Sequence, residues 1–133
     1  MQYTKSEIMR SLEEGSVLDD FPICSGNEVL KVALDKMNLK GLGFCIIYDD
    51  EIGILTDGDI RRKVAIGNMP LHALLLRPLK NLGTFPCTNL SLPFDTNAFD
   101  KIARNGKTYV PIIEDHKKCS YVIDVKRFAR SGS

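Results

Sequence analysis

An internal repeat is the feature that most constrains how this chain can fold. The repeated pattern is an amphipathic helix, two short apolar strands joined by a polar turn, and a second helix. The sequence predicts these elements at 27–38, 43–48, 52–55 and 58–66 in the first copy, and at 95–105, 109–113, 121–123 and 125–130 in the second. The copies align with an offset of 65 residues up to the polar turn, and of 67 beyond it, because the second turn is longer. A unit that returns in this way predicts a duplicated fold.

Each copy is too small to bury all of its apolar surface alone. The helices of each copy cover one face of its sheet and leave the other apolar face uncovered. Two copies can bury these uncovered faces against each other. We therefore expect an α/β (α+β) fold of two β-α-β-β-α repeats packed about a pseudo-two-fold axis. The expected divisions are an N-terminal helix and lead-in at 1–20, a first repeat at 21–70, a leucine-rich connector at 71–84 and a second repeat at 85–133.

Charge and hydropathy argue against several classes of function. The 18 Lys and Arg residues against 17 Asp and Glu leave a net charge of +1, which gives no overall field to attract nucleic acid or an anionic membrane. No apolar run approaches the ~20 residues of a membrane span, and the N-terminus lacks the apolar core of a signal peptide. We therefore expect a cytoplasmic protein that binds neither nucleic acid nor membrane.

The cysteines and histidines form no recognisable catalytic or metal site. Cys24, Cys45, Cys87 and Cys119 are widely spaced with no C-x-x-C pair, and neither histidine is spaced with a cysteine as in a zinc site. No Ser-His-Asp triad, activated cysteine or phosphate-binding glycine loop is discernible. We expect reduced thiols, no metal, and a module without catalytic residues of its own.

The segment GILTDGDIRR, residues 53–62, carries the most specific motif. Gly53, two apolar residues, Thr56, two variable residues and Asp59 match the hallmark of CBS domains, the modules named after cystathionine β-synthase. Together with the repeat, this motif makes the chain after about residue 20 resemble a tandem CBS pair, also called a Bateman module. The resemblance implies a regulatory domain that binds a nucleotide.

A narrower likeness concerns the parent enzyme of such a module. The segments KGLG at 40–43, TDGDIRR at 56–62 and FARSG at 128–132 resemble the C-terminal CBS pair of bacterial arabinose 5-phosphate isomerases of the KpsF/KdsD kind. Those enzymes serve the synthesis of Kdo, a sugar of surface lipopolysaccharide. Similar pairs occur on sugar-phosphate nucleotidyltransferases, which remain an alternative parent.

The chemistry of a nucleoside gives these motif residues distinct roles. A carboxylate in the first turn of a helix can accept hydrogen bonds from both ribose hydroxyls, and the resemblance assigns this role to Asp59. It assigns contact with phosphate to the hydroxyl of Thr56, near the free N–H groups of the helix. Thr56 and Asp57 can equally serve as helix caps without any ligand, and we favour the cap for Asp57 while keeping it among the ligand-binding candidates.

The base is expected in a cleft bordered by apolar side chains. The candidates in the first repeat are Ile23, Cys24, Phe44 and Ile46, and the second repeat is expected to lend Lys107 and Tyr109 to the same cleft. Lys40, Lys107 or Arg61 can help to neutralise phosphate, and the sequence does not choose among them.

The second repeat departs from the motif. With the offset of 67, Ser120, Ile123 and Lys126 stand at the positions of Gly53, Thr56 and Asp59. A lysine cannot accept a hydrogen bond, so we expect at most one ribose-type site, in the first repeat.

These features support two hypotheses for the function of the whole chain. The first is a ligand-sensing CBS pair that binds AMP, ADP, ATP, S-adenosylmethionine or a CMP-sugar as a regulatory ligand, with no required cofactor. It would form a homodimer and control a covalently linked or associated sugar-phosphate enzyme domain, an arabinose 5-phosphate isomerase in the narrower likeness. The second is a structural dimerisation or oligomerisation module with a vestigial pocket.

Overall fold

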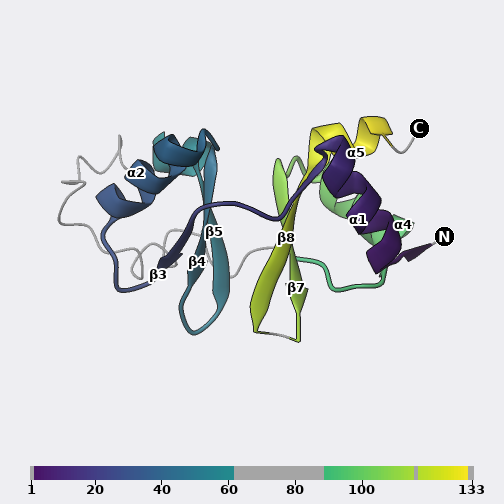
Figure 1. The fold of residues 1–133 in the computed structure, drawn as a ribbon, viewed down its shortest axis with the longest axis horizontal. Helices are drawn as coiled ribbons and strands as arrows, with labels where there is room; N and C mark the ends of the chain where they lie inside the picture. Colours follow the sequence, from purple (N-terminus) through teal and green to yellow (C-terminus); the bar gives the residue numbers. More distant parts are fainter. Residues whose placement is uncertain (1, 62–88, 116, 132–133) are drawn as a thin grey trace. The chain divides into compact units, whose positions relative to one another are not determined.

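The chain forms two compact α/β units, which are described separately below (Figure 1). The structure is a computed structural model that describes residues 2–61, 89–115 and 117–131. The first-repeat unit comprises Phe21–Cys87, and the second-repeat unit comprises Met1–Asp20 together with Thr88–Ser133. The predicted α/β class is confirmed. The predicted connector at 71–84, the end of the helix expected at 58–66, and both histidines lie outside the described residues.

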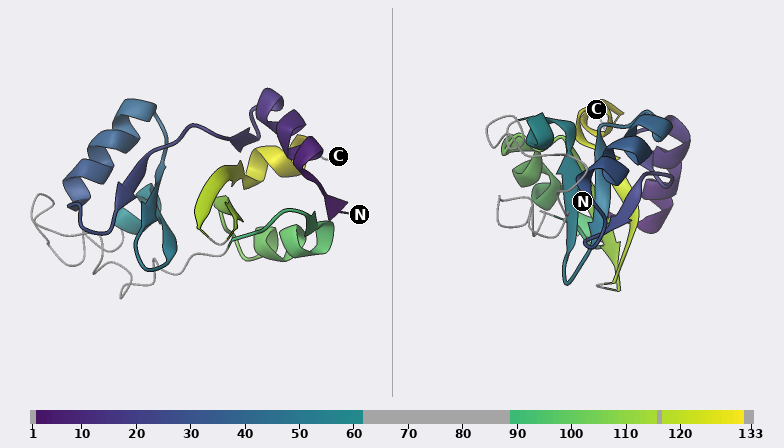
Figure 2. Two further views of the ribbon diagram at one scale, coloured as in Figure 1. Left: turned by 60° about the horizontal axis from the view of Figure 1, so that its bottom comes forward. Right: turned by 90° about the vertical axis from the view of Figure 1, so that its left-hand side faces the viewer.

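The first-repeat unit is built on a three-stranded sheet. Its strands are β3 (Ile23–Ser25), β4 (Phe44–Tyr48) and β5 (Ile52–Thr56), in the order β3-β4-β5. Strand β3 runs parallel to β4, and β5 returns antiparallel as the second arm of a hairpin. Helix α2 (Leu30–Lys40) connects β3 to β4 and lies against one face of the sheet (Figure 2). It ends at Lys40, two residues beyond the predicted end at 38, and Gly41 closes the last turn with a positive φ of 66°.

The second-repeat unit has the same plan with an extra contribution from the N-terminus. Its main sheet contains β2 (Val17–Leu18), β8 (Lys118–Asp124) and β7 (Tyr109–Glu114), in that order, and its helices are α1 (Lys5–Glu14), α4 (Thr96–Arg104) and α5 (Val125–Ser131). A parallel bridge between Leu90 and Ile112 takes the place of the β3–β4 pairing in the first repeat. A small sheet of β1 (Gln2–Tyr3) and β6 (Phe94–Asp95) completes the unit.

The spacing of Ile8, Met9 and Leu12 predicts the N-terminal helix at about 5–14, and α1 occupies these residues. Its first turn is closed by the backbone N–H of Thr4, which donates to Glu7 Oε2 at 2.8 Å, and its last by Gly15 with a φ of 82°. Ile8 is fully buried in the core of the second-repeat unit, and β2 pairs with β8. The segment before residue 21 is therefore an integral part of the second-repeat unit.

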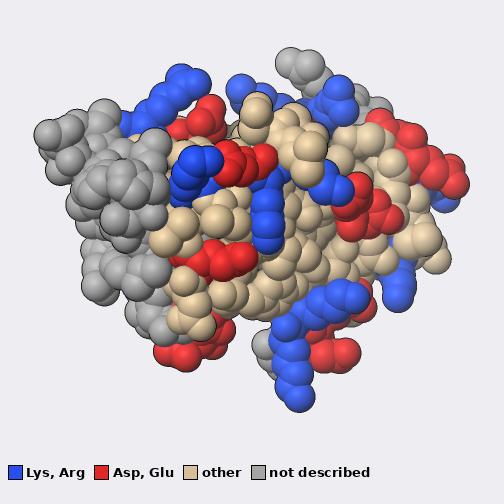
Figure 3. Space-filling model, turned by 60° about the vertical axis from the view of Figure 1, so that its left-hand side comes forward, with Lys and Arg blue, Asp and Glu red and all other residues tan. Residues whose placement is uncertain are grey.

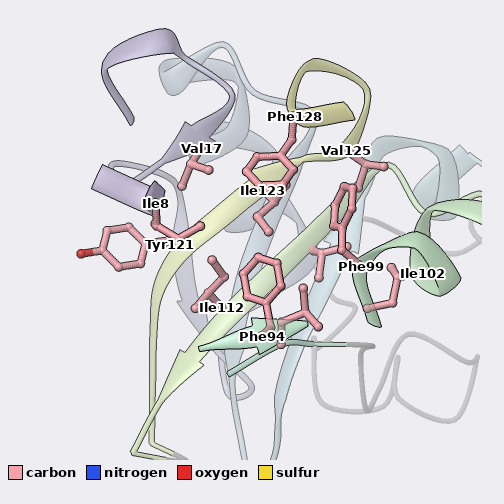
Figure 4. Packing of buried hydrophobic residues seen from close by; sticks show 12 residues of the cluster. Ile8, Val17, Phe94, Phe99, Ile102, Ile112, Tyr121, Ile123, Val125 and Phe128 are labelled. Carbon is pink, nitrogen blue, oxygen red and sulfur yellow. The ribbon is translucent and has the colours of Figure 1, made fainter. Parts of the chain in front are cut away.

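Each unit has its own apolar core. In the second-repeat unit, aromatic side chains from α4 and α5 meet above the sheet, with the rings of Phe99 and Phe128 4.9 Å apart, and Ile112 and Ile123 lie beneath them (Figure 4). In the first-repeat unit, Leu30, Ala33 and Met37 of α2 pack on one sheet face; the sheet contributes Cys24, Cys45, Ile47 and Leu55.

The strand register corrects the alignment of the two repeats. Cys45 pairs with Leu55, and Val110 pairs with Ile123, so the offset between repeats is 65 on the first strand of the hairpin and 68 on the second. The predicted offset of 67 is wrong by one residue because β7 and β8 change register at Ile112/Ile113, where β8 accommodates one extra residue.

Candidate functional site

The motif residues of the first repeat lie at the corner where β5 gives way to a helix that begins at Asp57. The hydroxyl oxygen of Thr56 accepts a hydrogen bond from the backbone N–H of Asp59 at 3.2 Å, which is the geometry of a helix N-cap. The N–H of Asp57 donates to the carbonyl of Gly43 at 2.8 Å and ties the corner to the start of β4. The cap is thus Thr56, while the Asp57 carboxylate pairs with Arg61 at 3.2 Å on the surface.

The apolar candidates divide between the two faces of the sheet. Ile23 is directly opposite Ile46, and Phe44 is directly opposite Thr56, so these four side chains share one face. Cys24 lies on the other face, in the core beneath α2, with 2% of its surface exposed. The structure therefore brings Thr56 together with Ile23, Phe44 and Ile46 on one sheet face and places the Cys24 side chain away from them.

The shared face is buried at its centre and exposed at its edge. Phe44 and Ile46 have no exposed surface, whereas Ile23 is 44% exposed and stands at the edge of the face. The ring of Phe21 lies 6.1 Å from that of Phe44 and extends the apolar surface toward the start of β3. An apolar wall next to a polar strand end is the combination that a flat base and its attached sugar require.

The matching corner of the second repeat has the same hydrogen bonds and different side chains. With the offset of 68, Asp124 matches Thr56 and Arg127 matches Asp59, in place of the predicted Ile123 and Lys126. The N–H of Arg127 donates to Asp124 Oδ1 at 3.3 Å, and the N–H of Val125 donates to the carbonyl of Thr108 at 3.0 Å.

Arg127 is committed to the N-terminal helix. Its guanidinium Nη1 donates to the carbonyl of Gly15 at 3.3 Å, at the C-terminal end of α1, where a cation also complements the helix dipole. The N–H of Asp124 donates to the carbonyl of Ser16 at 2.9 Å. A guanidinium has donors only, so this corner cannot accept hydrogen bonds from a ribose diol at that position.

The two candidates from the second repeat lie at the start of β7. Lys107 is exposed, and Tyr109 is half-buried directly opposite Asp124. Burial, followed by the charge of Asp124, raises the pKa of the Tyr109 hydroxyl. Both residues belong to the second-repeat unit, and their assignment to the same site as Asp59 stays a prediction.

The structure also contains a pocket that the sequence did not predict, beside the C-terminal end of α2. It has a volume of about 390 Å³ and lies between the C-terminal end of α2 and the start of the next helix, lined among others by Met37, Gly41, Gly43 and Asp57. The only sequence signal for it is the pair of glycines after α2.

The described residues show neither a group of metal ligands nor, on the face in Figure 3, a patch of a single charge. Within residues 2–61, 89–115 and 117–131, no three His, Cys, Asp or Glu side chains are grouped so as to hold a metal ion. Basic and acidic side chains are interspersed on the face shown in Figure 3. In the same part of the chain, no helix has the length and apolar content to cross a bilayer.

Comparison with solved structures identifies the class of this fold. A protein with CBS domains from Burkholderia ambifaria MC40-6 matches with a TM-score of 0.74 and 18% identity over 97% of this chain and 93% of that one. The hexameric CBS-CP12 protein from bloom-forming cyanobacteria matches with a TM-score of 0.69 and 18% identity, covering 87% of this chain and 68% of its own. A CBS-domain pair in complex with 5′-methylthioadenosine and S-adenosyl-L-methionine matches with a TM-score of 0.67 and 13% identity over 90% and 98% of the two chains.

The fold is that of a tandem CBS-domain pair. The sequence itself matches no protein-family model and no curated protein. At identities of 13–18%, these similarities establish the architecture, and what the chain binds has to be argued from its own residues.

Proposed function

We propose that this chain is a regulatory module that senses an adenine nucleotide or a related nucleoside ligand through its first repeat. The observation that carries the proposal is the corner of Thr56 and Asp59, next to the sheet face formed by Ile23, Phe44 and Ile46. An acidic side chain in a first helical turn beside an apolar wall suits a ribose diol attached to a flat base. Charge-assisted hydrogen bonds of this kind contribute about 1.5–3 kcal/mol where water is excluded.

The cap geometry supports different tasks for the two motif residues. Because Thr56 Oγ1 already accepts the N–H of Asp59, its own O–H remains a donor, which suits a phosphate oxygen. The carboxylate of Asp59 is then the acceptor for the sugar hydroxyls. Lys107 and Tyr109 are proposed as further ligand contacts, to be tested by their own variants.

The proposed biological role is control of a sugar-phosphate enzyme. A ligand that binds one conformation better than another shifts the population by its difference in affinity, and a homodimer would pass this shift to a linked or associated catalytic domain. We propose an arabinose 5-phosphate isomerase as that domain because of the KGLG, TDGDIRR and FARSG segments. A solved CBS pair in complex with S-adenosyl-L-methionine supports an adenosyl ligand as a class to test.

A second candidate function is a structural oligomerisation module without a ligand. The observation that favours it is Arg127, which stands at the position of Asp59 in the second repeat and serves to hold α1. A chain that has turned one of two equivalent corners into a structural contact could have lost the use of the other as well.

Ligand binding distinguishes the two functions. AMP, ADP, ATP, S-adenosylmethionine and CMP-sugars are screened by thermal shift, and hits are measured by calorimetry. A ligand at 100 times its dissociation constant should stabilise the protein by ~2.7 kcal/mol. The variant Asp59→Ala should weaken the hit roughly ten- to a hundred-fold, as expected for the loss of about 1.5–3 kcal/mol. Absence of any hit, or a hit whose affinity Asp59→Ala leaves unchanged, would favour the structural module.

A further inference from the structure

The pocket of about 390 Å³ beside the C-terminal end of α2 is a hollow inside the first-repeat unit. Its apolar lining consists of the buried Met37 and the partly buried Leu34 and Leu42. Its polar lining includes Asn38 and Asp57, both of which are exposed. A hollow of this size, with an apolar floor and a few polar groups, suits a small organic molecule.

The matching positions of the second repeat are packed into the core. At the C-terminal ends of α2 and α4, the glycines with positive φ align Leu34 with Phe99. The equivalent corner hydrogen bonds align Asp57 with Val125. Phe99 and Val125 are both buried, and the ring of Phe99 lies 4.9 Å from that of Phe128 (Figure 4). The first repeat has a smaller side chain and a carboxylate at these two positions, which leaves the hollow unfilled.

The charge around the hollow favours a cation. Among the described residues that line it, none is Lys or Arg, and the Asp57 carboxylate is the one charged group. The nearby N–H groups of the helix that begins at Asp57 do not offset this charge by binding an anion. They are already used, because the N–H of Asp57 donates to the carbonyl of Gly43 and that of Asp59 to the hydroxyl of Thr56.

The present partner of the Asp57 carboxylate leaves room for a ligand. Arg61 pairs with Asp57 at 3.2 Å, but its side chain is 80% exposed and is not part of the lining. An exposed pair between residues four apart contributes little to stability. A cationic group inside the hollow can therefore join Arg61 at the carboxylate or replace it.

We propose that this hollow binds a small organic cation with an apolar body, such as an amidine or an aliphatic amine. The apolar body packs against Leu34 and Met37, and the cationic end donates to Asp57. The site is separate from the proposed nucleotide site, because Met37 packs on the sheet face opposite that of Phe44 and Ile46. The proposal therefore does not depend on nucleotide binding.

The test compares probes of nearly equal shape and different charge: benzamidinium, benzamide and benzoate. Isotope-labelled methionine methyl groups report binding by NMR, because Met37 lines the hollow and the exposed Met9 belongs to the second-repeat unit. Benzamidinium should shift the Met37 signal, and not that of Met9, with a dissociation constant on the order of 1 mM, as expected for a fragment-sized ligand. Benzamide should bind about two- to fivefold more weakly, the effect of one exposed charge pair, and benzoate more weakly still.

Three variants locate the site. Leu34→Phe introduces the side chain that the second repeat has at this position, so it should fill the hollow and abolish the Met37 shift without lowering the thermal midpoint. Leu39→Phe is the matched control, because Leu39 is 85% exposed on the same helix and does not line the hollow. It should leave binding unchanged. In Asp57→Asn, benzamidinium and benzamide should bind equally.

The outcomes that would overturn the proposal are equally specific. They are no Met37 shift at about 10 mM benzamidinium, well above the expected dissociation constant, a benzoate shift as strong as that of benzamidinium, or full binding by a folded Leu34→Phe variant. If Leu34→Phe does not fold, the order of the probes on the unsubstituted chain and on Asp57→Asn decides the matter.

Discussion

Thr56 and Asp124 occupy the same place in the two repeats, and each accepts the N–H of the residue three positions on, at 3.2 and 3.3 Å. The residue that donates this N–H is Asp59 in the first repeat and Arg127 in the second. The backbone around both corners is tied in the same way, to Gly43 in one and to Thr108 in the other. The two corners therefore share a cap and differ in the charge that follows it.

The comparison separates what a fold needs from what a ligand needs. A cap requires only an oxygen that accepts an N–H, so a hydroxyl and a carboxylate both satisfy it. A ribose diol requires an acceptor in the first turn, and only the first repeat has one. The second repeat uses the same position to hold the end of α1 through Gly15.

The largest expected effect tests whether the two cores are equally important. Ile47 and Ile112 match at the offset of 65, and both are fully buried. Replacing either with Ala should lower the free energy of unfolding by about 2–5 kcal/mol, the cost of a large-to-small change in a packed core. Urea denaturation measures this. A loss below ~1 kcal/mol in only one variant would show that its unit contributes little to overall stability.

The second prediction contrasts Asp59 with Arg127. Arg127→Ala removes the bond to Gly15 and should cost about 0.5–1.5 kcal/mol of stability while leaving nucleotide affinity unchanged. Asp59→Asn should lower nucleotide affinity, because a neutral amide is a weaker acceptor for the diol than a carboxylate. It should lower the free energy of unfolding by at most about 0.3–1 kcal/mol, from the lost helix-dipole interaction. Calorimetric titration and urea denaturation of both variants measure the two quantities. Equal losses of affinity in the two variants would contradict the division of roles.

Most of the fold could be predicted from periodicity and capping. The residues of α1 were predicted, and so was a start of α4 at Asp95 or Thr96, of which Asp95 is the N-cap, because each helix has a clear polar start and an apolar stripe. Helix α2 begins at Leu30, three residues later than predicted. The reason is a local turn at 25–28, in which Glu28 accepts the N–H of Ser25 at 2.8 Å and Ser25 accepts the N–H of Asn27.

The parts that were missed depend on strand register and on distant contacts. The bulge at Ile112/Ile113 shifts the alignment by one residue, and counting the residues in a turn cannot reveal it. Successive side chains of a strand point to opposite faces of the sheet, so Ile23 and Cys24 should not have been predicted to border the same cleft. The contact of Arg127 with Gly15 joins residues 112 positions apart and leaves no local pattern.

The third prediction concerns the shared caps. Thr56→Ala and Asp124→Ala should each cost about 0.5–2 kcal/mol, the usual range for the loss of an N-cap. Thr56→Ser keeps the acceptor and should retain both stability and nucleotide affinity, which makes it the control. Thermal unfolding of the three variants measures the effect. If Thr56→Ala lowered affinity without lowering stability, its hydroxyl would act on the ligand and not on the helix.

The smallest effect is a pH dependence confined to the first repeat. The hydrogen bond from the Ser25 N–H lowers the pKa of the Glu28 carboxyl. Alignment of the N-cap residues of α2 and α4, Val29 and Asp95, places Phe94 at the position of Glu28 in the second repeat. Since the pKa is lower in the folded state, Glu28 stabilises the fold above its unfolded pKa, and this contribution is lost as pH falls through the folded pKa. Glu28 is partly exposed, so Glu28→Gln should cost only a few tenths of a kcal/mol at about pH 7 and nothing at about pH 3. Urea midpoints at both pH values measure this, and a difference that persists at low pH would mean that Glu28 acts through its size instead of its charge.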